Sequence, residues 1–262
     1  MNTSHSLGAL RRLWPGPRPY TEVQANDFFG RNSEIGAAHD RISGQRLTVI
    51  RAPSAAGKTS LLRAGIVPEL RLARLEALEA DGSPSGRPFP LLINQWLGRV
   101  GPERTIDFAK LLLLEVHRHL AECRSWYVAE VATSNDAPVY LKTLRDEIAR
   151  IDDTRERLKD LGISKGFMAL DRDGLVKPVV SRCLEKVNDE QITDLLLEID
   201  GVLSAAFESV VLILDQFEEI LGAAVLGRQA IVAVDAIYKQ CPETIRQMIS
   251  MRDDSCPFGS HA

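Results

Sequence analysis

The stretch LTVIRAPSAAGKTSLLRAGI, residues 47–66, constrains the fold more than any other part of the chain. An apolar run leads into a loop of small residues, and Gly57, Lys58, Thr59 and Ser60 then open a segment with apolar residues at helical spacing. A strand that passes through such a loop into a helix is typical of a phosphate-binding P-loop. The stretch therefore predicts an α/β protein built on a parallel sheet.

The residue types of this loop point to nucleotide binding. Small side chains let consecutive backbone N–H groups turn inward around phosphate oxygens, and the positive end of the following helix adds to the attraction. We expect Lys58 to reach the β- and γ-phosphates and the Thr59 hydroxyl to bind Mg²⁺, which prefers hard oxygen donors. The neighbouring Ser60 hydroxyl is not the expected metal ligand. The loop residues assigned to the nucleotide are Pro53, Ser54, Ala55, Ala56, Gly57, Lys58, Thr59 and Ser60.

Ala52 stands where the pattern G-x-x-x-x-G-K-[ST] has its first glycine. Alanine is compatible with this position if its φ is negative, because only a positive φ requires glycine. An ordinary turn between a strand and a helix is the alternative interpretation of the Gly-Lys-Thr triplet, and it stays open at this point.

A second signal is the apolar run of residues 210–214, which ends in Asp215. Consecutive apolar residues of this kind predict a buried central strand of a parallel sheet, with the carboxylate at its carboxyl end. That is the position of a Walker B aspartate, which would hold Mg²⁺ through water beside the Thr59 hydroxyl. The alternative is an aspartate that simply ends a core strand.

Hydrolysis needs a group that orients or deprotonates the attacking water. The residue after Asp215 is Gln216, whose amide can orient water but cannot accept its proton. Glu218 and Glu219 are the remaining candidates, with Glu218 preferred; the alternative is that both are solvated carboxylates at the start of a helix. Slow turnover, with the nucleotide acting as a switch, follows from this pattern.

Composition excludes several other classes of protein. The chain has 262 residues, 45% of them apolar, a net charge of −4 and a pI of about 5.8, so nothing global indicates a nucleic-acid or membrane partner. Its four cysteines form no C-x-x-C pair, which argues against a zinc site or a disulfide framework. No apolar run approaches the roughly 20 residues of a membrane span. We expect a cytoplasmic protein with reduced thiols.

The domain organisation expected from the sequence has three parts. Residues 1–27 form an extended arm rich in proline, glycine and arginine, residues 28–254 form the P-loop domain with a helical insertion at about 100–190, and residues 255–262 are a tail at a truncation point. Ser33 and Thr105 are expected helix caps, and Pro68 marks an expected helix break or the start of a new helix. The expected helices cover 34–42, 69–79, 105–122, 138–161, 174–187, 191–207 and 227–240, and the expected strands start at 46 and cover 89–96, 210–221 and 244–254.

Three stretches together resemble the novel STAND NTPases of bacteria, which are signal-transduction P-loop ATPases related to AAA+ and NB-ARC proteins. They are GPRPYTEVQANDFFGRNSEI, the P-loop followed by LLRAGIVPEL, and LILDQFEEIL, and the resemblance covers residues 16–70 and 208–254. It implies a three-layer P-loop NTPase fold of the ASCE, AAA+-like type. The chain would be the N-terminal NTPase portion of such a protein.

The resemblance also implies roles for residues outside the P-loop. In this family a phenylalanine-rich stretch ending in Gly-Arg-Glu lies against the nucleotide base, and here it reads Phe29, Gly30 and Arg31, with Asn32 in place of the glutamate and Glu34 nearby. An arginine after the next strand senses the γ-phosphate, and Arg252 matches it. A solvent-facing arginine at a strand end is the alternative for Arg252.

The function implied by the resemblance is a Mg-ATP-binding switch that hydrolyses ATP slowly, rests with ADP, and oligomerises and signals with ATP, in bacterial defence or regulation. Its expected partners are the nucleotide and either further copies of the chain or a missing C-terminal sensor domain. Two alternatives remain: an AAA-like motor ATPase, and a non-catalytic nucleotide-binding interaction module.

Overall fold

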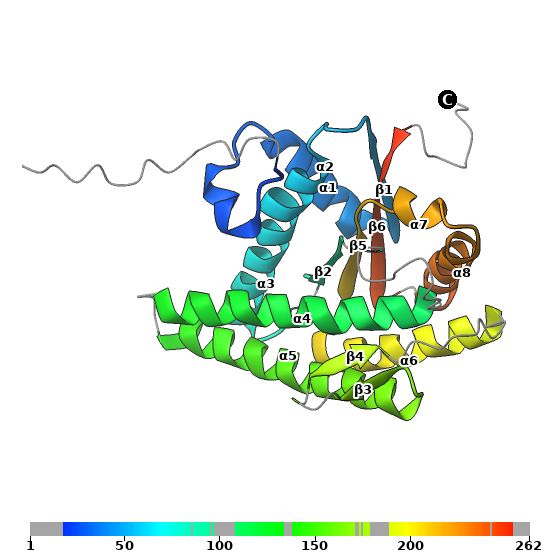
Figure 1. The fold of residues 1–262 in the computed structure, drawn as a ribbon. Helices are drawn as coiled ribbons and strands as arrows, with labels where there is room; N and C mark the ends of the chain where they lie inside the picture. The colour runs from blue at the N-terminus through cyan, green and yellow to red at the C-terminus, as the bar shows by residue number, and fades with distance from the viewer. Residues whose placement is uncertain are drawn as a thin grey trace, which may run out of the picture.

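The core of the computed structural model is a four-stranded parallel sheet in the order β1-β6-β5-β2 (Figure 1). The strands are β1 (Leu47–Ala52), β2 (Phe89–Ile93), β5 (Val210–Leu214) and β6 (Ile245–Arg252). The structure describes residues 18–84, 86–94, 96, 108–133, 138–170, 173, 175–178, 189–241 and 243–253. An α/β protein with a parallel sheet, as expected, is confirmed.

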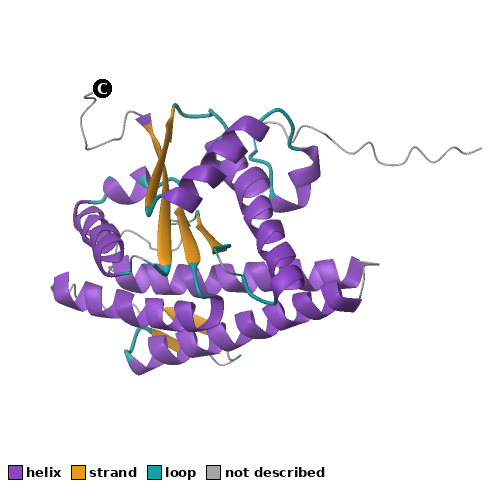
Figure 2. Ribbon diagram, turned by 180° about the vertical axis from the view of Figure 1, so that it is seen from behind, coloured by secondary structure: helices purple, strands orange, loops and turns teal. Residues whose placement is uncertain are grey.

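Helices surround this sheet (Figures 1 and 2). The α-helices are α1 (Asn32–Gly44), α2 (Lys58–Ser60), α3 (Val67–Asp81), α4 (Phe108–Thr133), α5 (Pro138–Ser164), α6 (Asp189–Phe207), α7 (Glu218–Leu221) and α8 (Ala224–Gln240). A 3-10 helix, η1 (Glu22–Asp27), precedes α1, and a π-helix, η2 (Leu61–Ile66), joins α2 to α3.

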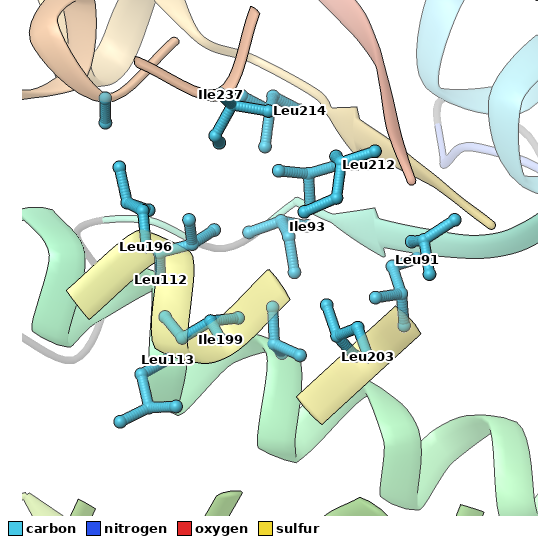
Figure 3. Packing of buried hydrophobic residues seen from close by; sticks show 14 of the residues in the cluster. Leu91, Ile93, Leu112, Leu113, Leu196, Ile199, Leu203, Leu212, Leu214 and Ile237 are labelled. Carbon is cyan, nitrogen blue, oxygen red and sulfur yellow. The ribbon is translucent and has the colours of Figure 1, made fainter. Parts of the chain in front are cut away.

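Two separate apolar clusters lie on the two faces of the sheet. Side chains alternate between the faces of a strand, so Ile213 of β5 faces one cluster and its neighbours Leu212 and Leu214 face the other. The first cluster joins the sheet to α1, η2 and α3. The second joins it to α4, α6 and α8, and Figure 3 shows its packing. The result is a layer of helices on each face of the sheet.

The strand register brings the carboxyl ends of β1, β6 and β5 to one edge of the sheet. Ala52 at the end of β1 is level with Arg252 of β6, and Leu214 at the end of β5 is level with Ile249 of β6. The P-loop and Asp215 follow directly, so the residues that carry the proposed chemistry come from neighbouring strand ends.

The predicted insertion at 100–190 contains α4, α5 and a small antiparallel pair, β3 (Met168–Leu170) and β4 (Val176–Pro178). The helix α4 is not peripheral, because eleven of its residues are buried and many belong to the cluster against the sheet. The helix predicted over 174–187 is wrong where the structure describes it, since residues 176–178 are a strand. Residues 179–188 lie outside the described residues.

Three further sequence-based boundaries differ from the structure. The strand predicted over 210–221 ends at Leu214, because Gln216 takes a φ of 54° and turns the chain into α7. The strand predicted over 89–96 ends at Ile93. Residues 22–27, expected as the end of an extended arm, form η1, whose capping box joins Thr21 and Gln24.

The predicted helix caps and the predicted boundary at Pro68 agree only in part with the structure. The first residue before α1 is Arg31, so Ser33 lies inside the helix and is not its cap. Thr105 lies outside the described residues. Pro68 is the second residue of α3, so it marks the start of a new helix, one of the two expected outcomes. It follows η2, where the Val67 N–H bonds to the Leu62 carbonyl five residues back. A proline lacks the N–H of a normal α-helical bond, and a π-turn accommodates that loss.

A buried ion pair ties α3 to α5. Nε of Arg74 lies 3.1 Å from Oε2 of Glu147, and both side chains are fully buried. Nη1 of Arg74 also donates to the carbonyls of Arg87 and Phe207, at 3.0 and 3.2 Å. The insertion is therefore joined to the NTPase core by a desolvated charge pair as well as by apolar contacts.

We predict that Arg74→Met lowers the free energy of unfolding by about 3–5 kcal/mol, because it leaves the Glu147 carboxylate buried without its buried partner, with only the more exposed Arg150 still paired to it. The double variant Arg74→Met, Glu147→Leu should recover part of that loss. Guanidinium denaturation measures both. The exposed pair Arg124 and Asp152 is the control, and Arg124→Met should cost about 1 kcal/mol or less. A double variant less stable than Arg74→Met would contradict the prediction.

Candidate nucleotide-binding site

The P-loop backbone has the shape that an anion cradle needs. Ala55 and Gly57 take positive φ values of 62° and 79°, and Gly57 immediately precedes α2. Left-handed residues alternating with right-handed ones turn successive N–H groups to one side of the chain. Ala52 is not among the described residues with positive φ, so alanine is compatible with the position where the pattern has a glycine.

Lys58 folds back across the loop. Its Nζ donates to the carbonyl oxygens of Ala52 and Pro53, at 2.7 and 3.0 Å. Both acceptors lie at the entrance of the loop, between the end of β1 and the start of α2. The ammonium group is thus held over the segment that the sequence assigns to phosphate.

Thr59 and Asp215, predicted to share a metal ion, are in direct contact. Oγ1 of Thr59 donates to Oδ2 of Asp215 at 2.7 Å, although 156 positions separate the two residues. Asp215 is fully buried, and its Oδ1 accepts the backbone N–H of Gln216 at 3.0 Å. The contact joins the start of α2 to the end of β5 and places a hydroxyl and a carboxylate at one point.

Trp96 holds the backbone of Asp215 in place through a hydrogen bond, a role that the sequence analysis missed. The indole Nε1 donates to the backbone carbonyl of Asp215 at 2.6 Å, and the ring packs against Phe108 and Phe217. Trp96 is itself buried and follows β2 at the same edge of the sheet. A tryptophan at the end of an apolar run was the available signal, but the predicted strand over 89–96 included it.

The segment before α1 reaches the P-loop through Arg31. Nη2 of Arg31 donates to the carbonyl of Ala56 at 2.9 Å, and Nη1 pairs with Glu34 at 2.9 Å. Ser33, the Glu34 backbone and Arg31 together lower the pKa of Glu34. Phe29 projects into solvent with 75% of its surface exposed, next to Gly30 with a φ of 81°. The structure therefore brings Arg31 to the loop and leaves the Phe29 ring uncovered.

Ser60 is turned away from the loop interior. Its side chain is buried, and its Oγ accepts the backbone N–H of Tyr20 at 3.1 Å. The Tyr20 ring packs against Phe28 with 5.4 Å between centroids. The hydroxyl thus anchors the N-terminal segment, which agrees with the expectation that Ser60 is not the metal ligand.

Arg252 and Glu218 form an ion pair at the end of β6. Nε of Arg252 lies 3.2 Å from Oε1 of Glu218, whose side chain is only 7% exposed. The other oxygen, Oε2, is buried and has no hydrogen-bond partner among the described residues. Beside the pair is an open hollow of about 640 Å³ that Leu221, Arg228 and Ile231 also line. The Arg252 side chain is 45% exposed, so it faces solvent and pairs with Glu218 at the same time.

Comparison with protein families decides the assignment. Residues 14–258 match the family described as Novel STAND NTPase 1. The chain belongs to this family. No curated protein and no solved structure shows a significant match. Membership indicates a P-loop NTPase that acts as a nucleotide-binding signalling switch, and it confirms the resemblance found in the sequence.

The donor atoms of this STAND site fit Mg²⁺ better than a softer metal. Thr59 and Asp215 offer a hydroxyl and a carboxylate oxygen, and Mg²⁺ is commonly bound by one or two such groups together with substrate phosphates and water. Among the residues that the structure describes, no group of three or more histidine, cysteine, aspartate or glutamate side chains could hold a metal ion by itself. In the same residues, no helix is long and apolar enough to cross a membrane.

We predict that Glu219→Gln stabilises the protein at neutral pH and has no effect in acid. Burial and the nearby charges of Glu218 and Asp215 raise the pKa of Glu219 above its ordinary value of 4.5. The charged form is therefore disfavoured in the folded state, and this penalty develops as pH rises from the unfolded pKa through the folded one. Melting temperatures of both proteins between pH 3.5 and 7.5 test this. A gap that widens toward low pH would contradict it.

Proposed function

We propose that the chain binds Mg-ATP and Mg-ADP, hydrolyses ATP slowly, and changes between resting and signalling states with the nucleotide bound. The observation that carries the proposal is the 2.7 Å hydrogen bond between Thr59 and Asp215. P-loop NTPases hold Mg²⁺ with these two residue types, and here they meet beside a loop with an anion-binding backbone. The bound Mg²⁺ would neutralise charge on the phosphates, while Lys58 and the loop N–H groups of residues 54–60 would hold them in place.

The fold around the site supports the three-layer ASCE, AAA+-like arrangement. The sheet is parallel throughout its described strands, each face has its own helical layer, and β6 lies between the P-loop strand and the strand that ends in Asp215. In the strand order, Arg252 at the end of β6 lies between the P-loop after β1 and Asp215 after β5. This position suits a residue that senses the γ-phosphate.

We further propose that Phe29, Gly30 and Arg31 cover the nucleotide base. The hydrogen bond from Arg31 to Ala56 places this segment beside the loop, and an exposed aromatic ring gains by stacking on a base. The Glu34 carboxylate pairs with the Arg31 guanidinium. Glu34 thus supplies the carboxylate of the family's glutamate, whose own position, two residues earlier, is Asn32 in this chain.

Slow turnover is supported by the groups that follow Asp215. Gln216 cannot act as a base, and the buried Glu218 carboxylate is tied to Arg252 in an ion pair whose arginine side is exposed. Glu218 must leave this pair before it can orient water, so the step that frees it limits the rate. This arrangement favours a switch over a fast AAA-like motor.

The outer edge of β1 supports the expectation of a further partner, either a second copy of the chain or a C-terminal sensor domain. Among the described strands β1 pairs only with β6, so its other side has unpaired backbone groups. A shallow hollow of about 310 Å³ lined by Arg41, Gln45 and Val49 lies along that edge. Uncovered strand edges are usually paired or protected in native proteins.

We predict that Lys58→Ala weakens Mg-ADP and Mg-ATP binding about ten-fold or more. Loss of a charge-assisted hydrogen bond to phosphate costs about 1.5–3 kcal/mol. Isothermal titration calorimetry measures the affinity, and Lys239→Ala is the control, because it removes an exposed lysine paired with Asp235 at the end of α8. Unchanged nucleotide affinity in the folded Lys58→Ala protein would refute the proposed site.

We predict that Glu218→Gln lowers kcat for ATP hydrolysis about 100-fold while leaving nucleotide affinity nearly unchanged, because a general base or water-orienting group acts mainly in the chemical step. Glu219→Gln is the matched control and should change kcat only slightly. Single-turnover hydrolysis measures both. If Glu219→Gln has the larger effect, the roles of the two carboxylates are exchanged. If neither variant changes kcat, neither carboxylate acts on the attacking water, and if the parent protein itself hydrolyses no ATP, the chain is a binding module without catalysis.

A further inference from the structure

A second cluster of charged side chains lies away from the nucleotide site, where α3, α4 and η1 meet. At its centre is Cys123 of α4, which is fully buried. Nη2 of Arg71 lies 3.1 Å from the Cys123 sulfur, and the Arg71 side chain is only 1% exposed. A guanidinium at this distance stabilises a thiolate relative to a thiol.

His119 is the second cationic group of the cluster. It precedes Cys123 by one helical turn, so the two side chains share a face of α4. The imidazole is 2% exposed, and among the described residues neither ring nitrogen has a hydrogen-bond partner of normal geometry; Nδ1 lies 3.4 Å from Oε2 of Glu122. A buried imidazole without such partners is unusual.

The charges of the cluster support this interpretation. Burial acts to raise the pKa of Cys123, but His119 and Arg71 outweigh it, so the pKa lies below the ordinary value. Burial acts to lower the pKa of His119, but Cys123 and Glu122 raise it to about 9. Cys241 is also buried and has no such cations; burial and Asp200 raise its pKa to about 12.

Charged groups from every packed element surround the sulfur. The 3-10 helix η1 supplies Glu22, whose carboxylate pairs with Nη1 of Arg71, and the Trp126 ring covers the guanidinium at 5.1 Å. Tyr127, whose pKa burial raises, lies near the same charges and near Glu147. The ionisable groups are Glu22 from η1, Arg71 and Arg74 from α3, His119, Glu122, Cys123 and Tyr127 from α4, and Glu147 from α5.

We propose that Cys123 is a thiolate modification site that reacts with a small peroxide. The sulfur attacks one peroxide oxygen, an S–O bond forms and the O–O bond breaks. The leaving hydroxide takes the proton of the His119 imidazolium and departs as water. Sulfur is oxidised by two electrons to a sulfenic acid, and the peroxide is reduced. Arg71 holds the sulfur anionic before attack.

Access to the sulfur is controlled by η1. This helix has no buried residue of its own, and the ion pair from Glu22 to Arg71 holds it over the cluster. A short segment with little buried surface opens locally far more often than the whole domain unfolds. The peroxide therefore reaches Cys123 when η1 lifts, and the protein stays folded.

The test treats the reduced full chain with hydrogen peroxide at pH 7, traps sulfenic acid with a cyclic 1,3-diketone, and quantifies each cysteine by peptide mass spectrometry. Cys241 is the internal comparison, because it is buried but lacks the cations. Labelling at Cys123 should exceed that at Cys241 at least ten-fold, since each pKa unit changes the thiolate fraction about ten-fold. Equal labelling of the two cysteines would overturn the proposal.

Three variants separate the effect of the cluster from that of general exposure. His119→Gln should slow the reaction about ten-fold at pH 7, whereas His117→Gln, on the same helix two positions earlier, should leave it unchanged. Glu22→Gln should speed it, because it loosens η1 and removes a carboxylate near the sulfur. A folded His119→Gln protein that reacts at the parental rate would overturn the proposal. If that variant does not fold, the pH dependence of the reaction rate is measured on the parent protein. A rate nearly constant from pH 6.5 to 8 supports a thiolate, and a ten-fold rise per pH unit refutes it.

Discussion

The placement of β6 between β1 and β5 is the constraint on which the rest of the site depends. Parallel pairing on both sides of β6 fixes the two strand ends relative to each other, with β1 ending level with Arg252 and β5 level with Ile249, so the P-loop and Asp215 leave the same edge of the sheet. Only then can the Thr59 hydroxyl reach the Asp215 carboxylate. Buried apolar clusters on both faces hold this register, because a slip of one residue would turn every core side chain of a strand to the wrong face.

Charged side chains are paired in the protein interior as well as at the edge of the sheet that carries the proposed nucleotide site. Two arginines of α3, Arg71 and Arg74, are buried, and each pairs with a carboxylate from a different segment, Glu22 of η1 and Glu147 of α5. Both pairs join parts of the chain that are distant in sequence. Removing one partner of a buried ion pair is costly, so these two contacts favour one particular arrangement of η1 and α5 against α3.

The sequence was most informative where a local pattern has one physical solution. A small-residue loop between strand and helix, and an apolar run ending in Asp215, identified the family and predicted the two halves of the proposed site. It was less informative where long-range packing decides. Nothing local distinguishes residues 176–178 as a strand, because three residues give no periodicity, and β4 exists only through pairing with β3.

Roles set by tertiary contacts were also beyond a single sequence. Trp96 was assigned to a strand, but its indole supports the Asp215 carbonyl from β2's end. Ser60 was grouped with the nucleotide, but its hydroxyl accepts the N–H of Tyr20, a residue 40 positions earlier. Neither contact leaves a periodic or spacing signal, since each depends on which segment packs against the residue.

The π-helix η2 has a consequence for the orientation of everything after it. A π-turn takes in an extra residue, and each residue of a helix advances the side-chain direction by about 100°. The wider turn before Pro68 therefore rotates α3 relative to the helix that carries Thr59. Leu70 then faces the sheet, while Arg71 and Arg74 face η1, α4 and α5. The extra residue in this turn thus decides which elements the two buried arginines contact.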